Sequence, residues 1–68
     1  MKVFTVMFHT GSQDVIVNVF SSEVAAKKCA EDCAATLYPA NKFGWNGHFL
    51  TCEDRFEEWS VQNWTVKE

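Results

Sequence analysis

Two runs of alternating residues, KVFTVMFH at 2–9 and DVIVNVF at 14–20, constrain the fold of this chain more than any other feature. In both runs apolar residues recur at every second position, which is the period-two pattern of a strand with one buried face. The β-branched residues favour extended backbone, and the TGSQ segment between the runs supplies turn-forming residues. The sequence therefore predicts an antiparallel β-hairpin at the N-terminal end.

A helix is predicted next, over SSEVAAKKCAEDCAATL at 21–37. Ser21 or Ser22 can cap it by accepting a hydrogen bond from an early amide, and Glu23 suits the positive end of the helix dipole. Pro39 ends it. Small and apolar residues recur at helical spacing and predict a buried stripe of Ala26, Cys29, Ala30, Cys33 and Leu37. A stripe of small residues allows close approach to a sheet that carries large aromatics.

The second half of the chain has weaker signals. ANKFGWNG at 40–47 indicates turns, HFLTCE at 48–53 indicates a short strand, and the tail places Trp59 and Val61 out of phase with Trp64 and Val66. A bulge, or a helical turn around Phe56 followed by a strand, would reconcile the two phases. We predict a single α+β domain over residues 1–68, with one helix packed on one face of a small antiparallel sheet in the order ββαββ.

Composition narrows the functional classes. The 68-residue chain has a net charge of −3, so it lacks the basic field that nonspecific nucleic-acid binding needs, and this disfavours a nucleic-acid partner. No apolar run is long enough to cross a bilayer, and the N-terminus lacks the apolar core of a signal peptide. Three cysteines cannot all pair within one chain. We expect a reduced, cytoplasmic protein without a membrane partner.

Chemical motifs are sparse. Cys29, Cys33, His48 and Cys52 offer the atom types of a zinc site, but zinc knuckles place their cysteines closer together and on turns. Buried core thiols are the simpler interpretation, with a metal or redox protein as the alternative. Each histidine is isolated in sequence, and nothing resembles a phosphate loop or a nucleophile elbow. The sequence predicts no enzyme, no catalytic residues, no metal and no cofactor.

Aromatic and acidic residues of the second half are the candidate binding groups. Six aromatics could stack bases on a sheet, but only Lys42, Arg55 and Lys67 accompany them, so most are expected to fill the core. Trp45, in a loop flanked by glycines, is expected to be exposed and to act with Phe43 as an interface anchor. The nearby carboxylates could face a basic partner or be merely solvated. The predicted protein-binding residues are Phe43, Trp45, Glu53, Asp54, Glu57 and Glu58.

The order of hairpin runs, VFSSEVAAKKCAEDCAATLYPA and a following strand resembles the small T7-type bacteriophage inhibitors of host RNA polymerase, over about residues 3–52. The resemblance implies a phage-encoded protein that docks on a host enzyme and blocks it without chemistry. In that family acidic and arginine side chains on the sheet face and nearby loops make the contacts. Arg55, the only arginine of this chain, lies outside the matched segment. Length, acidity and aromatic loops are also similar to those of small anti-CRISPR proteins.

The leading functional hypothesis is therefore a noncatalytic inhibitor or adaptor for host takeover, acting in the host cytoplasm on a host protein such as RNA polymerase or a defence complex. The alternatives are an anti-CRISPR-type inhibitor and a single-strand nucleic-acid binder that uses an aromatic sheet face. A homodimer is also open, because an unpaired final strand could pair through its edge.

Overall fold

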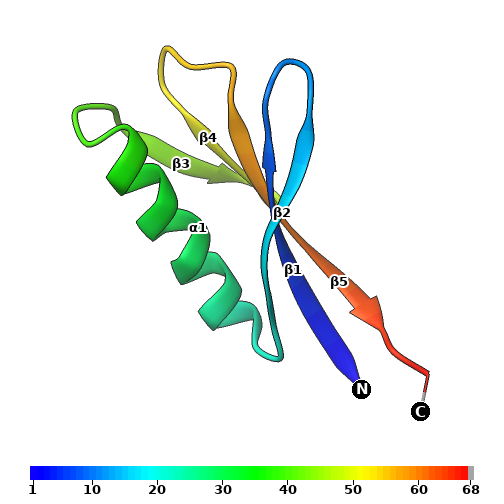
Figure 1. Cartoon of the computed structure of the whole chain (residues 1–68). Coiled ribbons are helices and arrows are strands. Elements are labelled where there is room, and N and C mark those ends of the chain that lie inside the picture. Colours follow the sequence, from blue (N-terminus) through cyan, green and yellow to red (C-terminus); the bar gives the residue numbers. More distant parts are fainter. Residues whose placement is uncertain (68) are drawn as a thin grey trace.

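The computed structural model describes residues 1–67 and shows one helix packed against one face of an antiparallel five-stranded sheet (Figure 1). The sheet order is β2-β1-β5-β4-β3. The α+β class is confirmed. In chain order the elements are β1 (Lys2–His9), β2 (Asp14–Phe20), α1 (Glu23–Leu37), β3 (Phe43–Asn46), β4 (Phe49–Cys52) and β5 (Glu58–Thr65).

The predicted order ββαββ is wrong, because residues expected in a turn form an additional strand. β3 pairs with β4 from Phe43–Cys52 to Asn46–Phe49, and Gly47 turns the chain between them with a φ of 65°. Glycine adopts this left-handed conformation without the steric cost that a Cβ imposes. The hairpin places Trp45 in a strand, not in the exposed loop that the sequence suggested.

The tail also differs from expectation. β5 is a continuous strand that pairs with β1 along its whole length and with β4 over residues 58–60, so its first half is central, while residues 62–65 have β1 as their one strand neighbour among the described residues. Trp59 faces the helix, whereas Trp64 lies on the other side, where its indole Nε1 donates to Thr5 Oγ1 at 2.9 Å. The two hydrophobic phases are therefore the two faces of one strand. The bulge lies in the first hairpin, where β2 has one extra residue, Val17, opposite Val6 and Met7.

The core lies between α1 and the sheet. The indole of Trp59 stacks on Phe8 with ring centroids 4.7 Å apart, and Tyr38 approaches its edge at 6.2 Å. The buried helix stripe differs from the predicted one, since Cys29 and Cys33 are only partly buried at its flank and Leu37 is exposed. The fully or nearly fully buried hydrophobic residues are Val6, Ala26, Ala30, Ala34, Leu50, Cys52, Trp59 and Val61.

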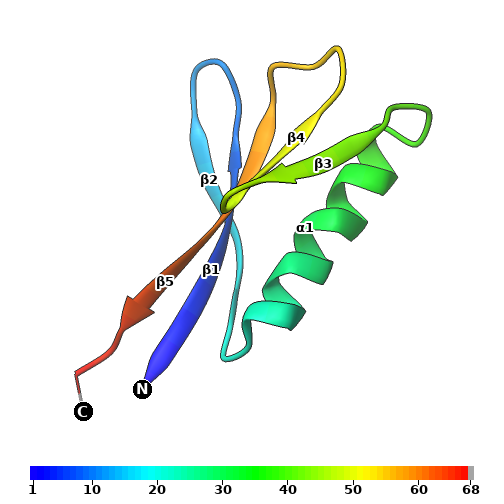
Figure 2. The same cartoon turned by 180° about the vertical axis from the view of Figure 1, so that it is seen from behind.

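The helix boundaries agree with the predicted caps. Ser22 Oγ accepts a hydrogen bond from the Ala25 amide at 3.3 Å, and the helix ends at Leu37 with Tyr38 as the C-cap, directly before Pro39. The helix runs across one face of the sheet, and the opposite face carries no layer formed by the described residues (Figure 2). Within residues 1–67 no helix combines the length and apolar character that a membrane span requires.

Candidate protein-binding surface

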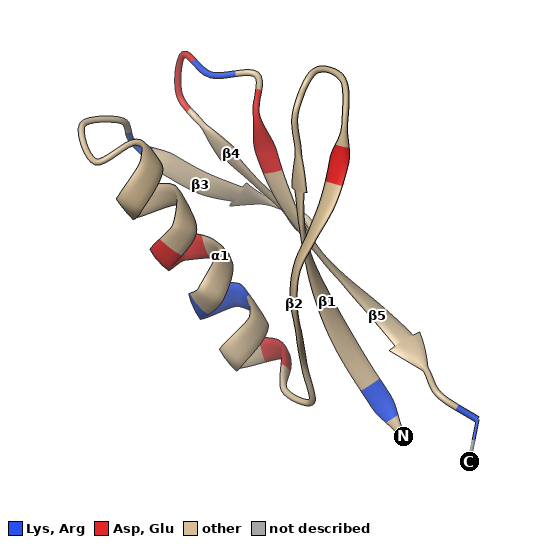
Figure 3. Ribbon diagram, in the orientation of Figure 1, with Lys and Arg blue, Asp and Glu red and all other residues tan. Residues whose placement is uncertain are grey.

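Carboxylates gather at one end of the sheet, where the β1–β2 turn and the β4–β5 connection lie side by side (Figure 3). We define the acidic end as Asp14 together with residues 53–58, a segment in which Arg55 is the single cation. The two loops touch, because a Cβ at Gly11 would lie 3.1 Å from Cε2 of Phe56. Lys2, at the start of β1 opposite Thr65, lies at the other end of the sheet. The fold therefore separates charge along the strands.

An exposed aromatic ring stands in the middle of these carboxylates. Phe56 is 77% exposed and lies between the exposed residues 53–54 and the start of β5. Asp54 adopts a φ of 63°, and the Arg55 amide donates to the Cys52 carbonyl at 3.2 Å, which closes a tight turn after β4. Aspartate tolerates the left-handed region better than most residues. The turn thus presents Glu53, Asp54 and Phe56 to solvent together.

The remaining predicted carboxylates are less available. Glu57 is partly buried, and its Oε2 is enclosed without a hydrogen-bond partner among the described residues. Burial, with the neighbouring Glu57 carboxylate, raises the pKa of Tyr38 and of Cys52, while Arg55 opposes the effect at both groups. Glu58 is partly buried and lies in β5 opposite His9. Glu57 therefore lies at the margin of the core, beside Tyr38 and Cys52, and Glu58 faces the uncovered side of the sheet.

The two predicted aromatic anchors lie on the same face of β3 but differ in exposure, since Phe43 is exposed and Trp45 is partly buried. Trp45 is partly buried against the core, its Nε1 donates to Glu31 Oε2 at 2.9 Å, and Lys27 Nζ lies 5.5 Å from its ring centroid. Phe43 stays close to the acidic end, because the Glu53 amide donates to the carbonyl of the preceding Lys42 at 2.8 Å. The structure thus brings Phe43, Glu53 and Asp54 together and fixes Trp45 to the helix flank.

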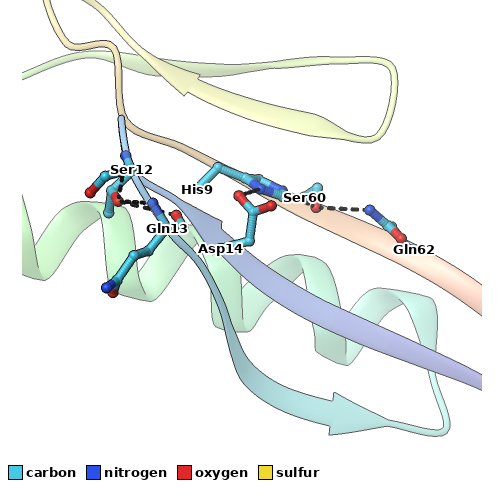
Figure 4. A network of polar contacts seen from close by, with 7 residues as sticks. His9, Ser12, Gln13, Asp14, Ser60 and Gln62 are labelled. Atoms are coloured by element: carbon cyan, nitrogen blue, oxygen red, sulfur yellow. Dashed lines mark hydrogen bonds and ion pairs between the residues drawn. The ribbon is translucent and has the colours of Figure 1, made fainter.

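A polar network that the sequence analysis missed links three strands at this end (Figure 4). His9 Nδ1 lies 2.7 Å from Asp14 Oδ1, and His9 Nε2 lies 2.7 Å from Ser60 Oγ. Gln62 Nε2 also donates to Ser60 Oγ at 3.5 Å. The pairing of His9 with Asp14 could have been inferred from the short TGSQ connection between the two strands, but the approach of Ser60 depends on the position of β5.

The atom types of this network are those of a serine nucleophile, a histidine base and a carboxylate that orients it. Ser60 is fully buried in the centre of the sheet, so a substrate carbonyl cannot approach its Oγ in this conformation. The network instead ties β2 to β1 and β1 to β5. It fixes the strands from which the acidic end projects.

The cysteines of the alternative metal hypothesis lie in two places. Cys29 and Cys33 share a flank of α1, and burial together with the adjacent Cys33 raises the pKa of the Cys29 thiol. Cys52 is buried in β4 on the helix side of the sheet. Within the described part of the chain no three of the cysteine, histidine or carboxylate side chains are grouped as a metal site would need.

Comparisons of the chain with protein-family models, curated proteins and solved structures gave no match. The resemblance to the phage inhibitors of RNA polymerase therefore rests on the sequence pattern alone, and the functional argument rests on the surface described above.

Proposed function

We propose that this protein is a noncatalytic protein-binding module that docks its acidic end on a basic surface of another protein. The observation that carries the proposal is the exposed Phe56 ring, framed by the Glu53 and Asp54 carboxylates on a tight turn. An apolar ring surrounded by charge is the usual anatomy of an interface anchor with a polar rim.

The two kinds of group have different roles in docking. Burial of an aromatic ring in a partner pocket supplies most of the binding energy of such anchors. Carboxylates at the rim accelerate association with a basic partner and help to fix its orientation. Because phosphates would be repelled at this end, a nucleic acid fits the same surface poorly.

A role as an inhibitor of a host enzyme complex is consistent with this docking mode. A small domain that occupies a basic surface of RNA polymerase or of a defence complex would exclude the nucleic acid that normally binds there. In this proposal the protein mimics the charge of that nucleic acid, and neither a cofactor nor a catalytic residue is needed.

The test is affinity capture from bacterial lysate with the full chain, followed by measurement of the dissociation constant for the captured protein. Phe56→Ala and the double substitution Glu53→Gln with Asp54→Asn alter the proposed surface, and asparagine tolerates the backbone at position 54. The matched control carries Val24→Ala with Asp32→Asn, an exposed aliphatic residue and an exposed carboxylate on α1.

We expect Phe56→Ala to weaken binding by about tenfold or more, which corresponds to about 1.4 kcal/mol. The double substitution should slow association and reduce the salt dependence of binding. The control should bind like the parent chain. Equal binding by all variants, or a loss only in the α1 control, would place the interface elsewhere and refute the proposal.

A further inference from the structure

The structure points to self-association: we infer that two copies of this chain pair through β2, in antiparallel orientation, and join their sheets into one. β2 is an edge strand of the sheet that pairs with β1 on one side, and its other side has no strand partner among the described residues. The inference concerns the edge of β2, which shares only Asp14 with the acidic end, and it does not depend on the proposed function.

The side chains of β2 are unusual for a protected edge. Four aliphatic residues, Val15, Ile16, Val17 and Val19, are between 40% and 61% exposed. The strand contains neither lysine nor proline, and Asp14 at its first position is its one charged residue. Natural edge strands usually carry such residues because they prevent pairing with other chains. The edge of β2 lacks this protection along most of its length.

The alternation of hydrogen-bonded and non-hydrogen-bonded pairs between β1 and β2 shows which backbone groups of β2 point away from β1. The Thr10 amide donates to the Gln13 carbonyl at 2.8 Å, so the next hydrogen-bonded pair along the hairpin is Phe8 with Val15. The amide and carbonyl of Ile16 therefore point outward. Beyond the bulge, the Val19 amide bonds to Oδ1 of Asn18 at 2.8 Å, so it too points away from β1.

The bulge explains why the best occupant of this edge is a second copy. In a regular strand the residues whose amide and carbonyl point outward are two positions apart. In β2 the bulge makes this spacing three positions, from Ile16 to Val19. A second, antiparallel copy carries the same spacing in reverse, so Ile16 of each copy can pair with Val19 of the other about a two-fold axis. The Asn18 bond to the Val19 amide is then replaced by a bond from the second copy.

The side chains agree with this register. Ile16 lies opposite Met7 and Val19 lies opposite Thr5, so both project from the uncovered face of the sheet and would form two apolar cross-strand pairs. Asp14 falls opposite Ser21 of the other copy, so no carboxylate meets another across the seam. The two acidic ends point in opposite directions and both stay accessible.

Sedimentation equilibrium of the full chain from micromolar to millimolar concentration tests the inference. The parent chain should approach twice the 7.8 kDa monomer mass at the highest concentration. Ile16→Lys with Val19→Lys places like charges opposite each other in both pairs and should give a monomer. Ile16→Lys with Val19→Glu places opposite charges in both pairs and should restore the dimer. Val24→Lys, at an exposed valine on α1, is the matched control and should behave like the parent chain.

Circular dichroism of each variant establishes that it is folded. Amide hydrogen exchange of the unsubstituted chain gives an independent measurement: the Ile16 and Val19 amides should exchange more slowly as the concentration rises. A mass of one chain at every concentration, assemblies larger than a dimer, or no restoration by the charge-complementary pair would overturn the inference.

Discussion

Trp59 and Trp64 lie five residues apart in one strand, yet we expect their removal to have very different effects on stability. Trp59 is 1% exposed and is held between Phe8 and Tyr38, whereas Trp64 is 53% exposed on the other face. Replacing a buried tryptophan with alanine costs about 3 to 5 kcal/mol, because both the transfer energy and the packing around the cavity are lost. Removing Trp64 costs about 1 kcal/mol through its bond to Thr5.

The size of the domain makes the first loss severe. At 0.05 to 0.15 kcal/mol per residue, a chain of 68 residues has a free energy of unfolding of about 3 to 10 kcal/mol. Trp59→Ala should therefore remove about a third or more of this free energy, and all of it at the lower end of the range, while Trp59→Phe, which keeps an aromatic ring against Phe8, should give an intermediate loss.

Urea unfolding followed by far-ultraviolet circular dichroism measures these differences, with Trp64→Ala as the matched control. The midpoints should fall in the order parent, Trp64→Ala, Trp59→Phe, Trp59→Ala. If the free energies of unfolding of Trp59→Ala and Trp64→Ala differed by less than about 1 kcal/mol, the burial of Trp59 and the central position of β5 would both be refuted.

Three further outcomes follow from single sites. Ser60→Ala should destabilise the fold by about 1 to 3 kcal/mol in urea unfolding, because His9 Nε2 loses its partner; a neutral effect would show that the network is dispensable. Burial raises the pKa of Cys52 above the ordinary 9.0, so its contribution to stability is complete below that pH and is lost as the pH rises. Thermal melts of Cys52→Ala should therefore show a shallower alkaline decline than those of the parent chain, and parallel declines would contradict this. Ser22→Ala should cost about 1 kcal/mol in the same melts, because the Ala25 amide loses its cap; an unchanged melting temperature would contradict this.

The local signals in the sequence located the first half of the fold well. Period-two alternation identified both strands of the hairpin, and the serine cap with Pro39 set the limits of α1. Such patterns are local, because the geometry of the backbone imposes its own period on the residues that face the core. The sequence also identified Glu53, Asp54 and Phe43 as candidate binding residues, and the fold brings these three close together.

Other features of the surface depended on contacts between distant segments. Phe56 belongs to the group of aromatics of which most were expected to fill the core, and it is exposed because its connection passes over Gly11 instead of under the helix. Trp45 was expected to be exposed, and it packs against α1 because β3 forms a hairpin with β4. No local pattern distinguishes these two outcomes for an aromatic residue near a glycine.

By itself, the sequence determined the hairpin, the helix and its ends, and the excess of acidic charge, since each depends on neighbouring residues and the period of the backbone. Only the tertiary structure decided that the last strand lies between β1 and β4, and this one placement has several consequences. It buries Trp59, brings Ser60 to His9 and leaves β2 at the edge with its aliphatic residues exposed. The physical reason is that strand order is selected by the total apolar surface that the sheet and the helix bury together, a quantity that belongs to the whole chain.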